Sequence, residues 1–152
     1  GPNVFKGYWK MPEKTKAELR ENGFFITGDL GKIDKDGYIH ILGRDKDLII
    51  SGGFNIYPKE LEIFIDDHEG VLESAVVGIP HPDFGETPIA IIVPEIGNPP
   101  NLSRIKENFK AQIARYKHPK DLLLVDKLPR NTMGKVQKNV MRNQYKKFYS
   151  KN

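Results

Sequence analysis

The stretch GRDKDLIISGGFNIYPKE, residues 43–60, divides the chain into two parts with different patterns. Residues 1–45 are rich in turn signals, with short strand-like runs between them. From Lys46 onward, apolar strand runs alternate with stretches at helical spacing. We therefore expect two structural units, residues 1–45 and 46–152, with their border at Lys46.

The second unit is predicted to be an α+β domain, a three-stranded sheet with helices on its faces. A hairpin over 48–56 is expected to turn at Gly52-Gly53, and Pro58 suits the first position of a helix, where no amide hydrogen is needed. The expected strands are 74–79, 88–93 and 122–125, and the expected helices are 58–68, 101–116 and 138–149.

The first unit is predicted to be β-rich. Asp36-Gly37 between strand-like runs is typical of a hairpin turn. The strands of residues 1–45 are too few to close a core by themselves. We therefore expect this unit to be the last piece of a larger β-rich domain whose remainder lies upstream.

Composition excludes several classes of protein. The 152 residues are 38% apolar and 29% charged, which is typical of a globular protein. No apolar run approaches the roughly 20 residues that span a bilayer. The chain has no cysteine, which excludes disulfides, thiolate metal sites and a cysteine nucleophile and agrees with a cytoplasmic location. The four histidines show no metal-ligand spacing.

The formal net charge of +4 is concentrated at one end. The segment after Tyr116 contains ten basic residues and only two acidic ones, Asp121 and Asp126, so its formal net charge is +8. Such an end attracts phosphates of a nucleotide, a coenzyme or a nucleic acid, although a solvated basic helix face explains single lysines equally well. The ten are Lys117, Lys120, Lys127, Arg130, Lys135, Lys138, Arg142, Lys146, Lys147 and Lys151.

Three glycine-bearing motifs are candidates for chemistry. Thr27-Gly28-Asp29 presents a carboxylate that could accept both hydroxyls of a ribose, but a turn-stabilising aspartate is the simpler explanation of the tripeptide alone. Ser51-Gly52-Gly53 lacks two Cβ atoms, so a thin ligand can approach its backbone, and a plain hairpin turn is the alternative.

The third motif is Pro129-x4-Gly134-Lys135. A nucleophilic carboxylate and a polyphosphate repel each other, and a lysine on a flexible loop can place a point charge between them. The alternative is a solvated loop in a basic tail. Lys138 and Arg130 are expected to be surface charges.

In this order and spacing, the motifs resemble three core motifs of the acyl-adenylate-forming enzymes, which include acyl-CoA synthetases, adenylation domains and luciferases. The resemblance implies that Asp29 and Arg44 hold the ribose of ATP and that Lys135 serves adenylation. It also implies that Lys46 is the hinge between a large and a small domain. Ser51, Gly52 and Gly53 would line the pantetheine channel for CoA, which favours a CoA ligase.

The resemblance further implies that residues 1–45 end a large adenylate-forming domain and that residues 46–152 form its small mobile domain. The missing N-terminal domain would hold most of the Mg²⁺ and ATP site, so this chain alone is expected to be inactive. Segments 1–9 and 129–139 are most similar to those of bacterial malonyl-CoA synthetases, which favours malonate as the acid. A protein acetyltransferase acting on Lys135, as in some acyl-CoA synthetases, is a regulatory hypothesis.

Two alternatives stay open at this point. One is a broader short- or medium-chain acyl-CoA synthetase. The other is a non-enzymatic basic module that binds nucleic acid. The second is disfavoured because aromatic residues are not interleaved with the basic ones in an RNA-binding pattern, and because it leaves Asp29, Arg44 and the glycine pair unexplained. We therefore expect no nucleic-acid partner.

Overall fold

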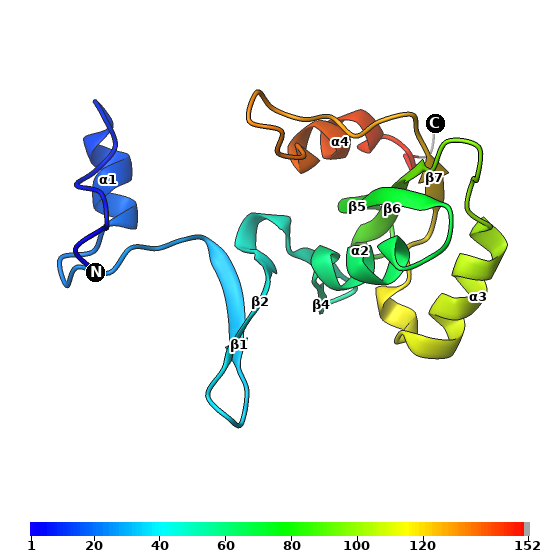
Figure 1. Ribbon diagram of the computed structural model, residues 1–152, viewed down its shortest axis with the longest axis horizontal. Helices are drawn as coiled ribbons and strands as arrows, with labels where there is room; N and C mark the ends of the chain where they lie inside the picture. Colours follow the sequence, from blue (N-terminus) through cyan, green and yellow to red (C-terminus); the bar gives the residue numbers. More distant parts are fainter. Residues whose placement is uncertain (151–152) are drawn as a thin grey trace. The chain divides into compact units, whose positions relative to one another are not determined.

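The computed structural model describes residues 1–150 and divides the chain into two compact units, Gly1–Asp45 and Lys46–Asn152 (Figure 1). Lys151, the last residue of the basic end, and Asn152 lie outside the described residues. A short 3₁₀ turn, η1, Asp45–Asp47, occupies the border between the units.

The first unit contains a helix, α1 (Pro12–Glu18), and an antiparallel hairpin of β1 (Asp29–Ile33) and β2 (Ile39–Arg44). The hairpin and its turn after Asp34 confirm the prediction from Asp36-Gly37. The carboxylate of Asp34 accepts the backbone N–H groups of Asp36 and Tyr38 at 3.0 and 2.9 Å, which closes the turn. The hairpin therefore aligns Asp29 with Arg44 at its open end.

No residue of the first unit is buried. Ile33, Ile39 and Ile41 on the hairpin are 72%, 70% and 64% exposed. Ile33 and Ile39 pair across the two strands, and Ile41 follows two residues later on the same face. One face of this hairpin is therefore apolar without a core of its own to cover it.

The second unit is built on one five-stranded sheet. The pair β5 (Val71–His81) and β6 (Gly85–Pro94) is antiparallel over its whole length. β7 (Leu122–Leu124) runs parallel to β6. These are the three strands that the pattern predicts.

Two further strands join the same sheet. β3 (Ile49–Ser51) and β4 (Phe54–Ile56) form the expected hairpin, and Ser51 pairs with Gly85 of β6. The α+β prediction is confirmed, with five strands instead of three because this one pairing attaches the hairpin.

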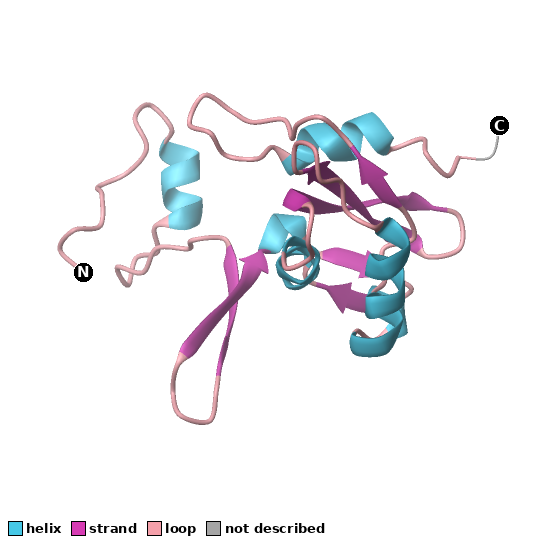
Figure 2. Ribbon diagram, turned by 45° about the vertical axis from the view of Figure 1, so that its right-hand side comes forward, coloured by secondary structure: helices cyan, strands magenta, loops and turns pink. Residues whose placement is uncertain are grey.

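Helices cover both faces of the sheet (Figure 2). α2 (Pro58–Asp66) and α3 (Leu102–Gln112) enclose a core with one set of alternating strand residues, including Val76, Ala90 and Ile92. α4 (Lys138–Tyr145) packs Met141 against the other set, including Val77, Ile89 and Ile91. In the described part of the chain, no helix is long and apolar enough to cross a membrane.

The helix starts agree better with the sequence than the helix ends do. Pro58 opens α2, and the side chain of Asn101 caps α3 by accepting the N–H of Arg104 at 3.0 Å. α2 stops at Asp66, two residues before its expected end. α3 stops at Gln112, and a 3₁₀ turn, η2 (Arg115–Lys117), follows.

We predict that residues 46–152 fold without the first unit, because every buried apolar residue of the described chain lies in that range. The isolated unit should show a cooperative thermal transition by circular dichroism and dispersed amide NMR signals. Residues 1–45 alone should show neither, since they have no buried side chain. A non-cooperative transition of residues 46–152 would contradict this.

Candidate functional site

Asp29 and Arg44 form an ion pair at the open end of the first unit's hairpin. The Nε of Arg44 lies 2.9 Å from Oδ1 of Asp29, and its Nη1 donates to the carbonyl of Thr27 at 2.9 Å. Both side chains remain accessible, at 59% for Arg44 and 29% for Asp29. The structure therefore brings these two predicted residues together, and they could present an acceptor and a donor to the hydroxyls of a sugar.

Gly52 and Gly53 form the two-residue turn between β3 and β4. Both have positive φ, +55° and +84°, as a type I′ hairpin turn requires. The N–H of Gly52 donates to the carbonyl of Phe84 at 2.9 Å, which anchors the turn to the start of β6. Nothing lies within 4 Å of where a Cβ of Gly53 would be. The tip of this glycine turn, Ser51–Phe54, is therefore thin and open.

Aromatic and basic side chains flank the glycine turn. Phe54 stacks on Tyr116 with ring centroids 4.7 Å apart, and Lys120 lies 4.4 Å from the ring centroid of Phe84. The expected helix over 101–116 ends earlier, at Gln112, so Tyr116 lies outside it and is 44% exposed. The sequence patterns do not indicate this cluster of aromatic and basic side chains, although Tyr116 and Lys120 both lie near the start of the basic end.

Lys135 lies in a tight loop of residues 130–136, the lysine loop. Oδ1 of Asn131 accepts the N–H groups of Met133 and Lys135 at 3.0 and 2.9 Å, and Gly134 has φ +77°. The side chain of Lys135 is exposed, and among the described residues it makes no side-chain hydrogen bond or ion pair. The backbone is therefore well held while its cation is available to a ligand.

Arg130 braces this loop. Its Nη1 donates to the carbonyl of Gly134 at 2.6 Å, and its Nη2 pairs with the carboxylate of Glu73 on β5. Arg130 lies at the surface as expected, with its side chain 44% exposed, but it also links the loop to β5. Glu73 lies 57 residues away in the chain, so no local pattern links the two.

Lys138 is also more than a surface charge. Its Nζ lies 2.6 Å from Oε1 of Glu62, and the side chains are only 17% and 9% exposed. The same oxygen of Glu62 accepts the N–H of Val76 at 2.9 Å. The pair thus joins α4, α2 and β5, and it fixes the start of α4 three residues after Lys135.

Lys46 lies in η1, the 3₁₀ turn at the border of the two units, and its side chain is exposed. This is the place that a hinge residue needs. The two carbonyls that follow along the turn, those of Lys46 and Asp47, accept hydrogen bonds from α4.

The lysine loop and the glycine turn lie at opposite ends of the β5–β6 pair. Arg130 attaches the lysine loop to Glu73 near the start of β5, whereas the glycine turn is bonded to Gly85, which pairs with His81 at the end of β5. Eight residue steps along a strand separate these anchors by roughly 26 Å. The two loops of this unit therefore cannot contact the same reacting atoms at the same time.

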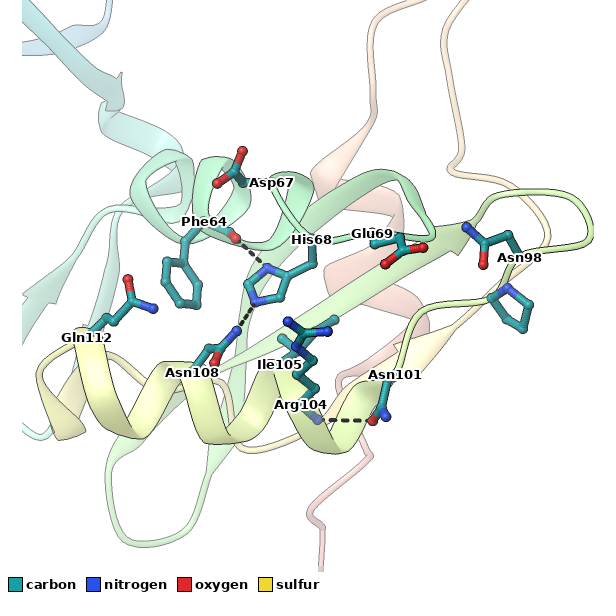
Figure 3. Close-up of a pocket in the computed structure, with 11 residues that line it drawn as sticks. Phe64, Asp67, His68, Glu69, Asn98, Asn101, Arg104, Ile105, Asn108 and Gln112 are labelled. Atoms are coloured by element: carbon teal, nitrogen blue, oxygen red, sulfur yellow. Dashed lines mark hydrogen bonds between the residues drawn. The ribbon is translucent and has the colours of Figure 1, made fainter.

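A polar cavity of about 550 Å³ lies between α2 and α3 (Figure 3). His68 bridges its walls: Nδ1 lies 2.8 Å from the carbonyl of Phe64, and Nε2 lies 3.0 Å from the amide of Asn108. The carbonyl can only accept, so Nδ1 carries the proton and Nε2 accepts from Asn108. Both ring nitrogens of His68 are therefore used in hydrogen bonds that join the two walls. None of the predicted site residues lines the cavity.

The titratable groups with shifted pKa values are not among the predicted site residues. A hydrogen bond with His40 lowers the pKa of Asp34 in the hairpin turn. Burial raises the pKa of Tyr149, and its hydrogen bond to Asp121 adds to the shift. Among residues 1–150, no three His, Asp or Glu side chains are grouped closely enough to hold a metal ion.

Comparison with known proteins identifies relatives of this arrangement. The family model "AMP-binding enzyme C-terminal domain" matches residues 60–135, half of the chain. ATP-bound MatB from Rhodopseudomonas palustris has a TM-score of 0.88 and 60% identity, covering 99% of this chain and 30% of MatB. Long-chain-fatty-acid–CoA ligase FadD13 of Mycobacterium tuberculosis is 44% identical over 142 residues, which is 93% of this chain and 28% of FadD13.

o-Succinylbenzoate CoA synthetase (MenE) from Bacillus subtilis, in complex with the acyl-adenylate intermediate OSB-AMP, has a TM-score of 0.86 and 37% identity. That match covers 93% of this chain and 29% of MenE. The chain thus spans less than a third of the length of each of these relatives.

We predict that Glu62→Ala destabilises residues 46–152 by about 3–5 kcal/mol, because it leaves Lys138 poorly solvated without its partner and the N–H of Val76 without an acceptor. Urea unfolding followed by circular dichroism measures this. Glu60→Ala on the same helix is the control: it removes the more exposed pair with Lys117 and should cost less than about 1 kcal/mol. Equal losses in the two variants would refute a structural role for the Glu62–Lys138 pair.

Proposed function

We propose that this chain, which belongs to the AMP-binding enzyme C-terminal domain family of AMP-forming acyl-CoA ligases, acts as the C-terminal part of a cytoplasmic acyl-CoA synthetase. In this proposal, residues 1–45 complete a large adenylate-forming domain and residues 46–152 are its small mobile domain. The uncovered apolar face of Ile33, Ile39 and Ile41 supports the first assignment, since a larger domain would bury it.

The separation of the two loops is the observation that carries the proposal. Acyl-CoA synthesis needs a cation during phosphoryl chemistry and a narrow channel during thiol attack. The lysine loop and the glycine turn offer these at opposite ends of one sheet. We infer that the second unit turns about Lys46 between two half-reactions and presents one end in each.

In the first half-reaction, a carboxylate oxygen of the acid attacks the α-phosphorus of ATP. The bond from that phosphorus to the bridging oxygen breaks, and pyrophosphate leaves. Lys135 lies between the two anions and balances the charge that moves to pyrophosphate. Asp29 and Arg44 hold the ribose through its hydroxyls, which fixes the nucleotide during the attack.

In the second half-reaction, the sulfur of CoA attacks the acyl carbon and the bond to the phosphate oxygen of AMP breaks. The thiol proton passes to solvent, and AMP leaves with that oxygen on its phosphate. Ser51, Gly52 and Gly53 line the pantetheine channel, where the absence of side chains at the glycine turn allows close approach. The withdrawal of Lys135 removes the charge that would otherwise favour the reverse reaction with pyrophosphate.

Among residues 1–150, no three His, Asp or Glu side chains are grouped closely enough to hold a metal ion by themselves, and the remainder of the polypeptide is proposed to hold most of the ATP site. We therefore assign the metal that accompanies ATP to the remainder of the polypeptide, and no step above is routed through it. The same reasoning predicts that the 152 residues alone form no acyl-adenylate.

Malonate is the proposed acid. The support is the 60% identity to MatB, a malonyl-CoA synthetase, compared with 44% to the long-chain ligase FadD13. The complete enzyme should use malonate with a kcat/KM at least about tenfold above that for acetate, butyrate or octanoate, because differential binding of about 1.4 kcal/mol gives this ratio. A preference for octanoate or butyrate would favour the broader short- or medium-chain synthetase instead.

We predict that Lys135→Ala in the complete enzyme lowers acyl-adenylate formation by about 10²–10³-fold and spares thioester formation from supplied acyl-adenylate. The reason is that the lost point charge serves only the first half-reaction. Pyrophosphate release and acyl-CoA formation are measured separately, with Lys127→Ala, an exposed lysine on the preceding segment, as control. Equal loss in both half-reactions would sink the role of Lys135.

Acetylation of Lys135 would remove the same charge, so we propose a protein acetyltransferase as a regulator of this site. The exposed position of the side chain supports this. Enzyme acetylated at Lys135 should show the half-reaction pattern of Lys135→Ala. Full pyrophosphate release from quantitatively acetylated enzyme, verified by peptide mass, would count against it.

A further inference from the structure

Arg142 of α4 holds the backbone of the border turn between the units. Its Nη1 donates to the carbonyl of Lys46 at 3.1 Å, and its Nη2 donates to the carbonyl of Asp47 at 3.2 Å. One planar guanidinium therefore donates to two successive carbonyls of η1. The fixed, forked arrangement of its N–H donors suits this geometry. Arg142 lies about 95 residues further along the chain than this turn.

The guanidinium has no other partner among the described residues. No carboxylate there forms an ion pair with it, and its Nε is buried without a hydrogen-bond acceptor. A buried donor left unsatisfied costs free energy, so the position of this side chain is maintained by the two carbonyls and by packing. Arg142 is therefore committed to the border turn.

α4 connects this contact to the lysine loop. The helix begins at Lys138, three residues after Lys135, and Lys138 is paired with the buried Glu62. Lys138 and Arg142 are four residues apart, so both tethers leave the same side of the helix. Met141 beside them is fully buried in the core. The lysine loop, α4 and the part of η1 that follows the carbonyl of Lys46 are thus held together as one rigid body.

We propose that Arg142 is the positioning residue of the hinge, which rests on the proposed function of Lys46 as the point of rotation. The hydrogen bond to the carbonyl of Lys46 fixes the peptide plane between Lys46 and Asp47 to the second unit. The first backbone torsions left free on the other side are φ and ψ of Lys46. Arg142 therefore confines the rotation to Lys46. Because α4 is held to η1, the lysine loop moves together with the second unit when Lys46 rotates.

The test uses the complete enzyme and a lysine-specific endoprotease. Attack at the Lys46–Asp47 bond needs the Lys46 carbonyl, which Arg142 occupies. Arg142→Ala should raise the cleavage rate at this bond by roughly tenfold, the change expected for loss of a charge-assisted hydrogen bond. Arg142→Lys, which keeps the charge but loses the fork, should give an intermediate rate. Lys146→Ala, an exposed charge one residue past α4, should match the wild type.

Cleavage at Lys110 on α3 reports general unfolding and should not change. An equal rise at Lys110 and Lys46, or an unchanged rate at Lys46, overturns the proposal. As a second readout, acyl-CoA turnover should fall several-fold in Arg142→Ala and recover in part in Arg142→Lys, because each turnover needs the hinge in two defined positions. Unchanged turnover would also overturn it. A wild type that makes no acyl-CoA would instead refute the proposed function, since the cleavage pattern does not depend on activity.

Discussion

The long antiparallel pairing of β5 with β6, with one register shift between Val71 and Glu73, is the constraint on which the rest of the second unit depends. The two strands pair from Val71 with Pro94 to His81 with Gly85, and most of their residues are buried on both faces. A sheet packed on both sides does not bend to bring its ends together. The two loops that it carries therefore stay apart, and any chemistry that needs both must turn the whole unit.

The charges around α4 divide the basic end into structural and available cations. Arg130 is paired with Glu73, Lys138 with Glu62, and Arg142 with two backbone carbonyls. Lys135 lies among them with an exposed side chain. The three paired cations hold the loop, the helix and the border turn in place, so Lys135 can be positioned accurately without being neutralised by the protein.

Local patterns predicted the features that depend on neighbours in the sequence. Pro58, Asn101 and the turn after Asp34 act through backbone geometry within a few residues, and all three are present where the sequence indicates. Apart from the helix ends, the differences from the prediction concern partners far apart in the chain. The sequence near Arg130 does not indicate that its partner is Glu73, 57 residues upstream. The sequence near Lys138 likewise does not indicate Glu62, 76 residues upstream. For the same reason, the single pairing of Ser51 with Gly85 that completes the sheet could not be foreseen.

The glycine turn shows how one local sequence can meet two requirements. A type I′ turn needs positive φ at both central residues, and Asn-Gly satisfies that need as well as Gly-Gly does. At position 52, a Cβ would only reach ordinary contact with Phe84 at 3.5 Å, so the fold leaves room for a side chain there. The positive φ of +55° at position 52 strains most side chains, however, so turn geometry by itself already favours glycine there. The same glycine pair leaves the backbone thin and open, which is what the proposed pantetheine channel needs.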